Sequence, residues 1–205
     1  MKFEGFSKSD FETFHVNGLE DRMNAIQTRI QPKFKAIGET LASDLSAMTG
    51  MEMFLHIAKH ARRTVNPPND TWLAIANNKR GYKKHPHFQV GLFDDHAFIW
   101  LAYIYELPNK AEYAQKFLDQ MDFIIENVPG DFVVSMDHMK KDAEKISVIN
   151  LKKTLERFRD VKKAEFLIGR QIPADDPIVQ DGDGFISLAK GTFETLIPIY
   201  KLGFA

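Results

Sequence analysis

The sequence contains no cysteine. Disulfide bridges, thiolate nucleophiles, cysteine-ligated zinc and iron–sulfur clusters are therefore all excluded. The lack of oxidative cross-links is typical of a protein from a reducing compartment. We therefore expect neither a disulfide scaffold nor cysteine chemistry.

The sequence also lacks a hydrophobic run long enough to cross a lipid bilayer. The longest strongly apolar segment, residues 97–105, is too short for a membrane span and is more typical of a buried strand. The first ten residues carry charges of both signs and no apolar stretch, unlike a signal peptide. We expect a soluble cytoplasmic protein that has no membrane partner, and the sequence leaves its oligomeric state open.

The composition is that of an ordinary globular protein, with 44% hydrophobic and 27% charged residues in 205. Apolar residues recur every three or four positions from Ile26 to Met48, which predicts a helix that Pro32 should kink or split. Further helices are predicted over residues 109–125, 150–161 and 185–202. Short strands are predicted between them, so we expect residues 1–205 to form a single compact α+β domain with a mainly antiparallel sheet and helices packed on it.

The clearest strand signal is a hairpin formed by residues 87–93 and 96–105 around a two-residue Asp94-Asp95 turn. This register places Val90 opposite Ile99 and Gln89 opposite Trp100. One face of the hairpin is then wholly apolar: Phe88, Val90, Leu92, Ala97, Ile99 and Leu101. The other face mixes aromatic and polar groups: His87, Gln89, Gly91, Phe93, His96, Phe98 and Trp100.

The net charge of −1 hides a basic segment at residues 56–87, which holds seven lysines and arginines against the single acid Asp70, and four of the seven histidines. Such a local positive field attracts anions. The candidate binding residues are Arg62, Arg63, Lys79, Arg80, Tyr82, Lys83, His85, His87 and Gln89. The arginines and lysines would hold phosphate, Tyr82 would stack on a base or sugar, and His85 or His87 would donate hydrogen bonds. Alternatively, the basic residues only fringe a sheet edge and deter aggregation.

Metal and cofactor motifs are weak. His56 and His60 are four residues apart, but no zinc-protease Glu lies between them and no carboxylate nearby in sequence completes a ligand set. The acidic turn at residues 181–184 does not fit a calcium loop, because Lys190 stands where that loop needs a glutamate. No glycine-rich phosphate loop occurs. We therefore predict no metal site, and the sequence names no cofactor.

Three stretches carry a resemblance to a known family: KHARRTVNPPNDTW at residues 59–72, KRGYK at 79–83 and PHFQ at 86–89. The chain resembles the YktB-like uncharacterised proteins of Gram-positive bacteria, almost from end to end. The resemblance implies a compact α+β fold and a cytoplasmic bacterial protein. It implies no activity, cofactor or catalytic residue.

Three functional hypotheses remain open from the sequence. The first is a module that binds an anionic small molecule, a nucleotide phosphate or a nucleic-acid backbone through the basic and histidine-rich surface of residues 56–87. The second is a hydrolase-type enzyme that uses His87 and a distant carboxylate on the mixed face of the hairpin. The third is a protein-interaction module with no small ligand.

Overall fold

The computed structural model describes residues 2–204 and has an α+β architecture built on one antiparallel sheet. The strand order is β1-β2-β3-β4-β7-β5-β6, and every neighbouring pair is antiparallel. The strands are β1 (Phe54–Ile57), β2 (Thr71–Ala76), β3 (His87–Leu92), β4 (His96–Tyr103), β5 (Val133–Ser135), β6 (Glu144–Lys145) and β7 (Phe166–Pro173).

Helices occupy the two ends of the chain and the connections between the later strands. The α-helices are α1 (Lys8–Glu12), α2 (Leu19–Ala25), α3 (Gln31–Thr49), α4 (Lys110–Asp119), α5 (Met121–Asn127), α6 (Leu151–Asp160) and α7 (Gly182–Leu202). Shorter turns are the 3-10 helices η1 (Thr13–His15) and η3 (Pro177–Val179) and the π-helical η2 (Ile26–Ile30). Among residues 2–204, no helix combines the length and apolar character that a membrane span requires.

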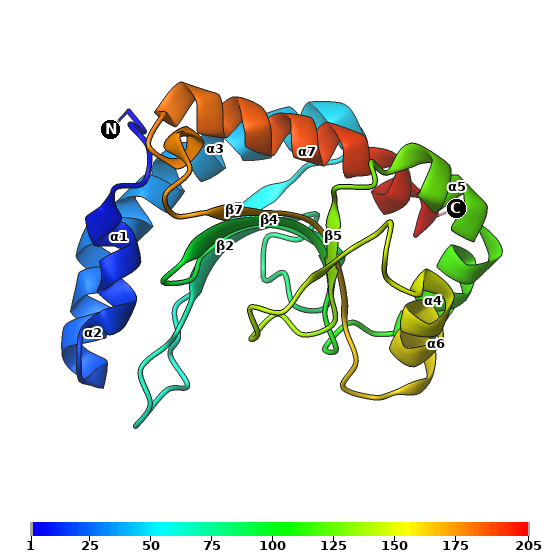
Figure 1. Ribbon diagram of the computed structural model, residues 1–205, viewed down its shortest axis with the longest axis horizontal. Coiled ribbons are helices and arrows are strands. Elements are labelled where there is room, and N and C mark those ends of the chain that lie inside the picture. Colours follow the sequence, from blue (N-terminus) through cyan, green and yellow to red (C-terminus); the bar gives the residue numbers. More distant parts are fainter. Residues whose placement is uncertain (1, 205) are drawn as a thin grey trace.

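The predicted hairpin register is confirmed. Val90 pairs with Ile99 and Gln89 with Trp100, and the backbone N–H of Phe93 donates to the carbonyl of His96 to close the turn. The predicted apolar face lies entirely in the main hydrophobic core. In Figure 1, α3 and α7 run across this side of the arched sheet, and their apolar stripes supply the other half of that core.

The opposite face of the sheet carries a smaller apolar cluster that includes Trp72, Phe98, Trp100 and Leu167. Loops rather than helices cover this face. Tyr82, in the connection after β2, and Ala143, in the connection after β5, pack on the cluster. Figure 1 shows these loops crossing the hollow side of the arch. Polar groups of the loops and the sheet are therefore buried together here.

Several element boundaries differ from the sequence predictions. The stripe from Ile26 is divided near Pro32, as predicted, but the division lies just before the proline: the π-helical turn Ile26–Ile30 precedes α3, and Pro32 stands at the beginning of α3. The helix predicted from residue 109 breaks at Gln120, whose φ of −118° and ψ of 27° are not helical. The pattern Ser9-Asp10-Phe11-Glu12 predicts a capping box that begins at Ser9, but the first helix is capped at Ser7, where the Asp10 carboxylate accepts from the Ser7 N–H.

Close packing between β4 and β7 explains why residue 169 is a glycine. Gly169 in β7 pairs with Trp100, and a Cβ at this position would collide with the carbonyl oxygen of Ile99. We expect Gly169→Ala to lower the free energy of unfolding by about 1–3 kcal/mol, measured by urea denaturation. The matched control is Gly191→Ala on the exposed surface of α7, where a Cβ meets nothing within 4 Å. It should raise stability by about 0.5–1 kcal/mol, and an equal loss in both variants would contradict this packing.

Candidate functional site

Tyr82 connects the basic loop after β2 to the covered face of the sheet. Its hydroxyl accepts a hydrogen bond from Trp72 Nε1 at 3.2 Å. Its ring lies 4.9 Å from the ring of His87 and 5.6 Å from that of His56. The loop therefore turns back over β2 and β3, and Tyr82 and Trp72 together form an aromatic floor.

His87 is fully buried beneath Tyr82, and both of its ring nitrogens are engaged. Gln89 Nε2 donates to His87 Nε2 at 2.8 Å, so the ring proton is on Nδ1, which donates to the carbonyl of His85 at 2.8 Å. Burial is the main cause of the low pKa of His87, about 3; the nearby imidazoles of His138, His56 and His85 also lower it, whereas the hydrogen bond to the His85 carbonyl raises it. The side chains of His87 and Gln89 and the backbone carbonyl of His85 thus form one hydrogen-bonded network around a neutral imidazole.

His60 is the point where the two basic loops meet. Its Nε2 pairs with Thr71 Oγ1 at 3.0 Å and its ring meets Trp72 edge-on at 5.6 Å. Burial, together with the charges of Arg63 and Lys83, lowers the pKa of His60 to about 4. Arg63 precedes β2 and Lys83 follows it, so cations from both loops act on one half-buried imidazole.

The five predicted cations differ in exposure and in their partners. Arg62, Lys79 and Arg80 are exposed, and the backbone N–H of Arg80 binds the side chain of Asn78 in the turn after β2. Arg63 is half-buried and donates through Nη1 to the carbonyls of Asn66 and Pro67, at 3.2 and 3.4 Å. Lys83 Nζ pairs with Glu106 at 3.1 Å.

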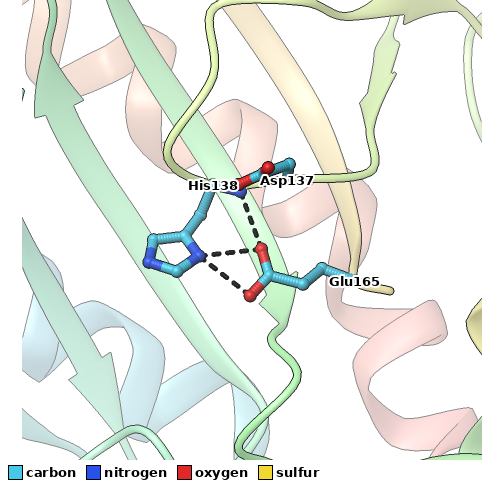
Figure 2. Close-up of side chains that lie close together, drawn as sticks. All are labelled: Asp137, His138 and Glu165. Atoms are coloured by element: carbon cyan, nitrogen blue, oxygen red, sulfur yellow. Dashed lines mark hydrogen bonds and ion pairs between the residues drawn. The ribbon is translucent and has the colours of Figure 1, made fainter. Parts of the chain in front are cut away.

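The sequence did not reveal the pair formed by Glu165 and His138, whose ring lies 5.6 Å from the ring of Trp72. Glu165, only 2% exposed, accepts the backbone N–H of His138 at 2.7 Å and its Nδ1–H at 2.7 and 2.9 Å (Figure 2). It also accepts the backbone N–H of Tyr105 at 3.2 Å. Burial opposes a charge on His138, but the hydrogen bond and charge of Glu165 outweigh it and raise the pKa of His138.

Asp70 is the second residue that sequence reasoning missed. It is 1% exposed, and neither carboxyl oxygen has a hydrogen-bond partner among residues 2–204. Burial raises its pKa to about 7, against the opposing charges of His138 and Arg63 and a weak interaction with its own backbone N–H. Asp70 directly precedes β2, and His138, from the loop after β5, acts electrostatically on its carboxyl group.

Weak signals for these residues do exist in the sequence. Asp70 is the lone acid of the basic segment, and Glu165 is a charged residue directly before the apolar run Phe166–Ile168. A buried charge at such a place needs a partner. Nothing in the sequence names His138 as that partner, because it lies 27 residues away in a loop.

Two surface hollows lie near the ends of these loops. One of about 330 Å³ lies beside α4 and the C-terminal end of α7, away from the covered face. The other, of about 230 Å³, is lined by Phe14, Asn69, Asp94 and Lys141. It adjoins both the loop that carries Asp70 and the loop that carries His138.

Comparison with known proteins places the chain in a family. A family model described as a domain of unknown function (DUF1054) matches residues 6–200. The chain belongs to this family. The DUF1054 match and the bacterial relatives confirm the resemblance to the YktB-like uncharacterised proteins.

Relatives cover almost the whole chain. A UPF0637 protein of Oceanobacillus iheyensis is 64% identical over 198 residues, which are 97% of this chain and 96% of the relative. A UPF0637 protein of Shouchella clausii is 59% identical over 202 residues (98% and 96%), and one of Listeria monocytogenes is 55% identical over 201 (98% of each). These names state no activity, so the function of a DUF1054 protein must be argued from its residues.

The buried neutral His87 should make stability depend on pH. Its folded pKa of about 3 lies below the unfolded value of 6.5, so its contribution is complete above pH 6.5 and is lost as the pH falls toward 3. From pH 6 to 4, we expect wild-type stability to fall relative to His87→Gln by up to about 1.4 kcal/mol per pH unit.

Urea denaturation at several pH values measures this difference. The control is Tyr82→Phe, which loses the bond from Trp72 but changes no group that titrates in this range, because the pKa of Tyr82 is about 12. Its stability difference from wild type should not vary with pH. A His87→Gln difference that is equally constant would show that His87 is not held neutral.

Proposed function

We propose that the protein binds a small anionic ligand, such as a phosphate ester or nucleotide, on the loop-covered face beside Tyr82 and Trp72. The observation that carries this proposal is the joint action of Arg63 and Lys83 on His60. Two cations from separate loops thus act at one place, next to an aromatic floor. Lys83 Nζ also pairs with Glu106, but the combined positive field of the two cations would attract an anion there.

The chemistry of these groups suits a phosphate. Arg63 donates to the carbonyls of its own loop through Nη1 only. Its Nε and Nη2 make no hydrogen bond within residues 2–204, so both are available to donate to an anion. Arg22 is a third cation close enough to add to this positive field. Burial lowers the pKa of Arg22, and the charge of Arg63 also lowers it. Half-buried Tyr82 offers ring surface for a base or sugar, next to the buried ring of Trp72.

The remaining candidate residues have supporting roles in this proposal. Exposed Arg62, Lys79 and Arg80 attract the anion at longer range, which salt screens. His85, His87 and Gln89 hold the ring of Tyr82 in place from below. A hydrolase that uses His87 as its acid or base is less well supported, because both ring nitrogens of His87 are engaged.

The test is a titration of the full chain with ATP and, separately, with inorganic phosphate. Both tryptophans, Trp72 and Trp100, lie in the cluster on the covered face, so their fluorescence reports binding and calorimetry gives the affinity. We expect Arg63→Ala and Lys83→Ala each to weaken ATP binding by roughly tenfold, about 1.4 kcal/mol. Affinity should also fall steeply with salt.

The matched controls are Lys59→Ala and Lys84→Ala, which remove one exposed charge from each of the same loops. Both should bind ATP nearly as wild type does. An equal loss in all four variants would mean a diffuse charge effect, and affinity that does not change with salt would also contradict the proposal. Release of phosphate from bound ATP, followed in the same samples, would replace simple binding with a hydrolase-type reaction.

A further inference from the structure

Three metal-binding side chains meet next to Trp72. One potential ligand atom from each of Asp137, His138 and Glu165 lies within 4.8 Å of the other two. Figure 2 shows the Asp137 and Glu165 carboxylates on the same side of the His138 ring. The site combines a loop segment with the residue before β7, so the fold assembles it from distant parts of the chain.

The neighbouring Asp70 is an independent sign that a cation binds here. Its carboxyl group is buried with both oxygens unpartnered among the described residues. Both His138 and Asp137 act electrostatically on this carboxyl group, and the ring of His138 lies 5.6 Å from that of Trp72, two residues after Asp70. A buried carboxyl without a partner is costly unless a cation or another donor supplies one.

We propose that Asp137, His138 and Glu165 bind one divalent transition-metal ion and that the neighbouring Asp70 carboxylate strengthens this binding by its charge, without being a ligand. An imidazole nitrogen with several carboxylate oxygens suits Mn²⁺ or Zn²⁺ better than Mg²⁺ or Ca²⁺, which prefer oxygen alone. The ion takes the place of the proton that His138 Nδ1 now shares with Glu165, and that proton leaves to solvent.

The surrounding hydrogen bonds keep the ligands in position. The backbone N–H groups of Tyr105 and His138 hold the Glu165 carboxylate from two directions. Asp137 uses Oδ1 to accept the backbone N–H of Met139 at 2.9 Å, which fixes its side chain in the loop. Oriented ligands of this kind are what a specific metal site requires.

This inference does not depend on the proposed anion site, because the cations that define that site are not metal ligands. The two proposals are tested with different probes. Metal binding is measured with the metal alone, so a failure of one leaves the other standing.

The experiment uses the full chain, stripped of metal with a chelator and titrated with Mn²⁺ under electron paramagnetic resonance and with Zn²⁺ by calorimetry. Wild type should bind one ion per chain, and excess Mg²⁺ should not displace Mn²⁺. Asp70→Asn and Asp137→Asn should each weaken binding by roughly tenfold or more. Both should remain folded, because the first removes an unpaired buried charge and the second keeps an oxygen for Met139.

The control variants are Asp142→Asn and His85→Gln, which remove a nearby carboxylate and a nearby imidazole outside the cluster. Their affinity for Mn²⁺ should equal that of wild type. The proposal is overturned if wild type binds no stoichiometric ion or if folded Asp70→Asn binds as tightly as wild type. It is also overturned if the two controls lose as much affinity as the cluster variants, or if Mg²⁺ competes equally.

Discussion

The covered face of the sheet depends on one buried carboxylate. Glu165 accepts hydrogen bonds from His138, through both its backbone and its ring, and from the backbone of Tyr105. A carboxylate removed from water is tolerated only when such donors satisfy it. The loop after β5 is thereby fixed against the sheet, and the ring of His138 is placed against Trp72.

Covering this face changes the chemistry of the polar residues beneath it. His60 and His87 lose their affinity for protons through burial, whereas Asp70 gains affinity for one. These shifts disfavour opposite charges, so below pH 7 their effects on stability partly cancel. The helix-covered face of the sheet is apolar, and there packing of the main core dominates. One sheet therefore has an apolar face that stabilises the fold and a second face whose buried polar groups have shifted pKa values.

Much of the framework could be predicted from the sequence because its signals are local. Alternation along residues 87–105 predicted the register and both faces of the hairpin, and the helix predicted over residues 150–161 is present as α6 (Leu151–Asp160). The pairing of Glu165 with His138 could not be predicted, because it depends on how two distant segments dock. The position of Asp70 as the lone acid of the basic segment and that of Glu165 before an apolar run are only weak signals, and neither shows that the side chain is buried.

Hydrogen exchange at two backbone amides tests the role of Glu165 most directly. In wild type, the N–H groups of His138 and Tyr105 should both be protected, because both donate to the same carboxylate. In Glu165→Ala, both should exchange rapidly while the amides of Gln89 and Trp100 in the central strands remain protected. If the His138 and Tyr105 amides keep their protection in this variant, Glu165 does not hold the loop, and the account of the covered face is wrong.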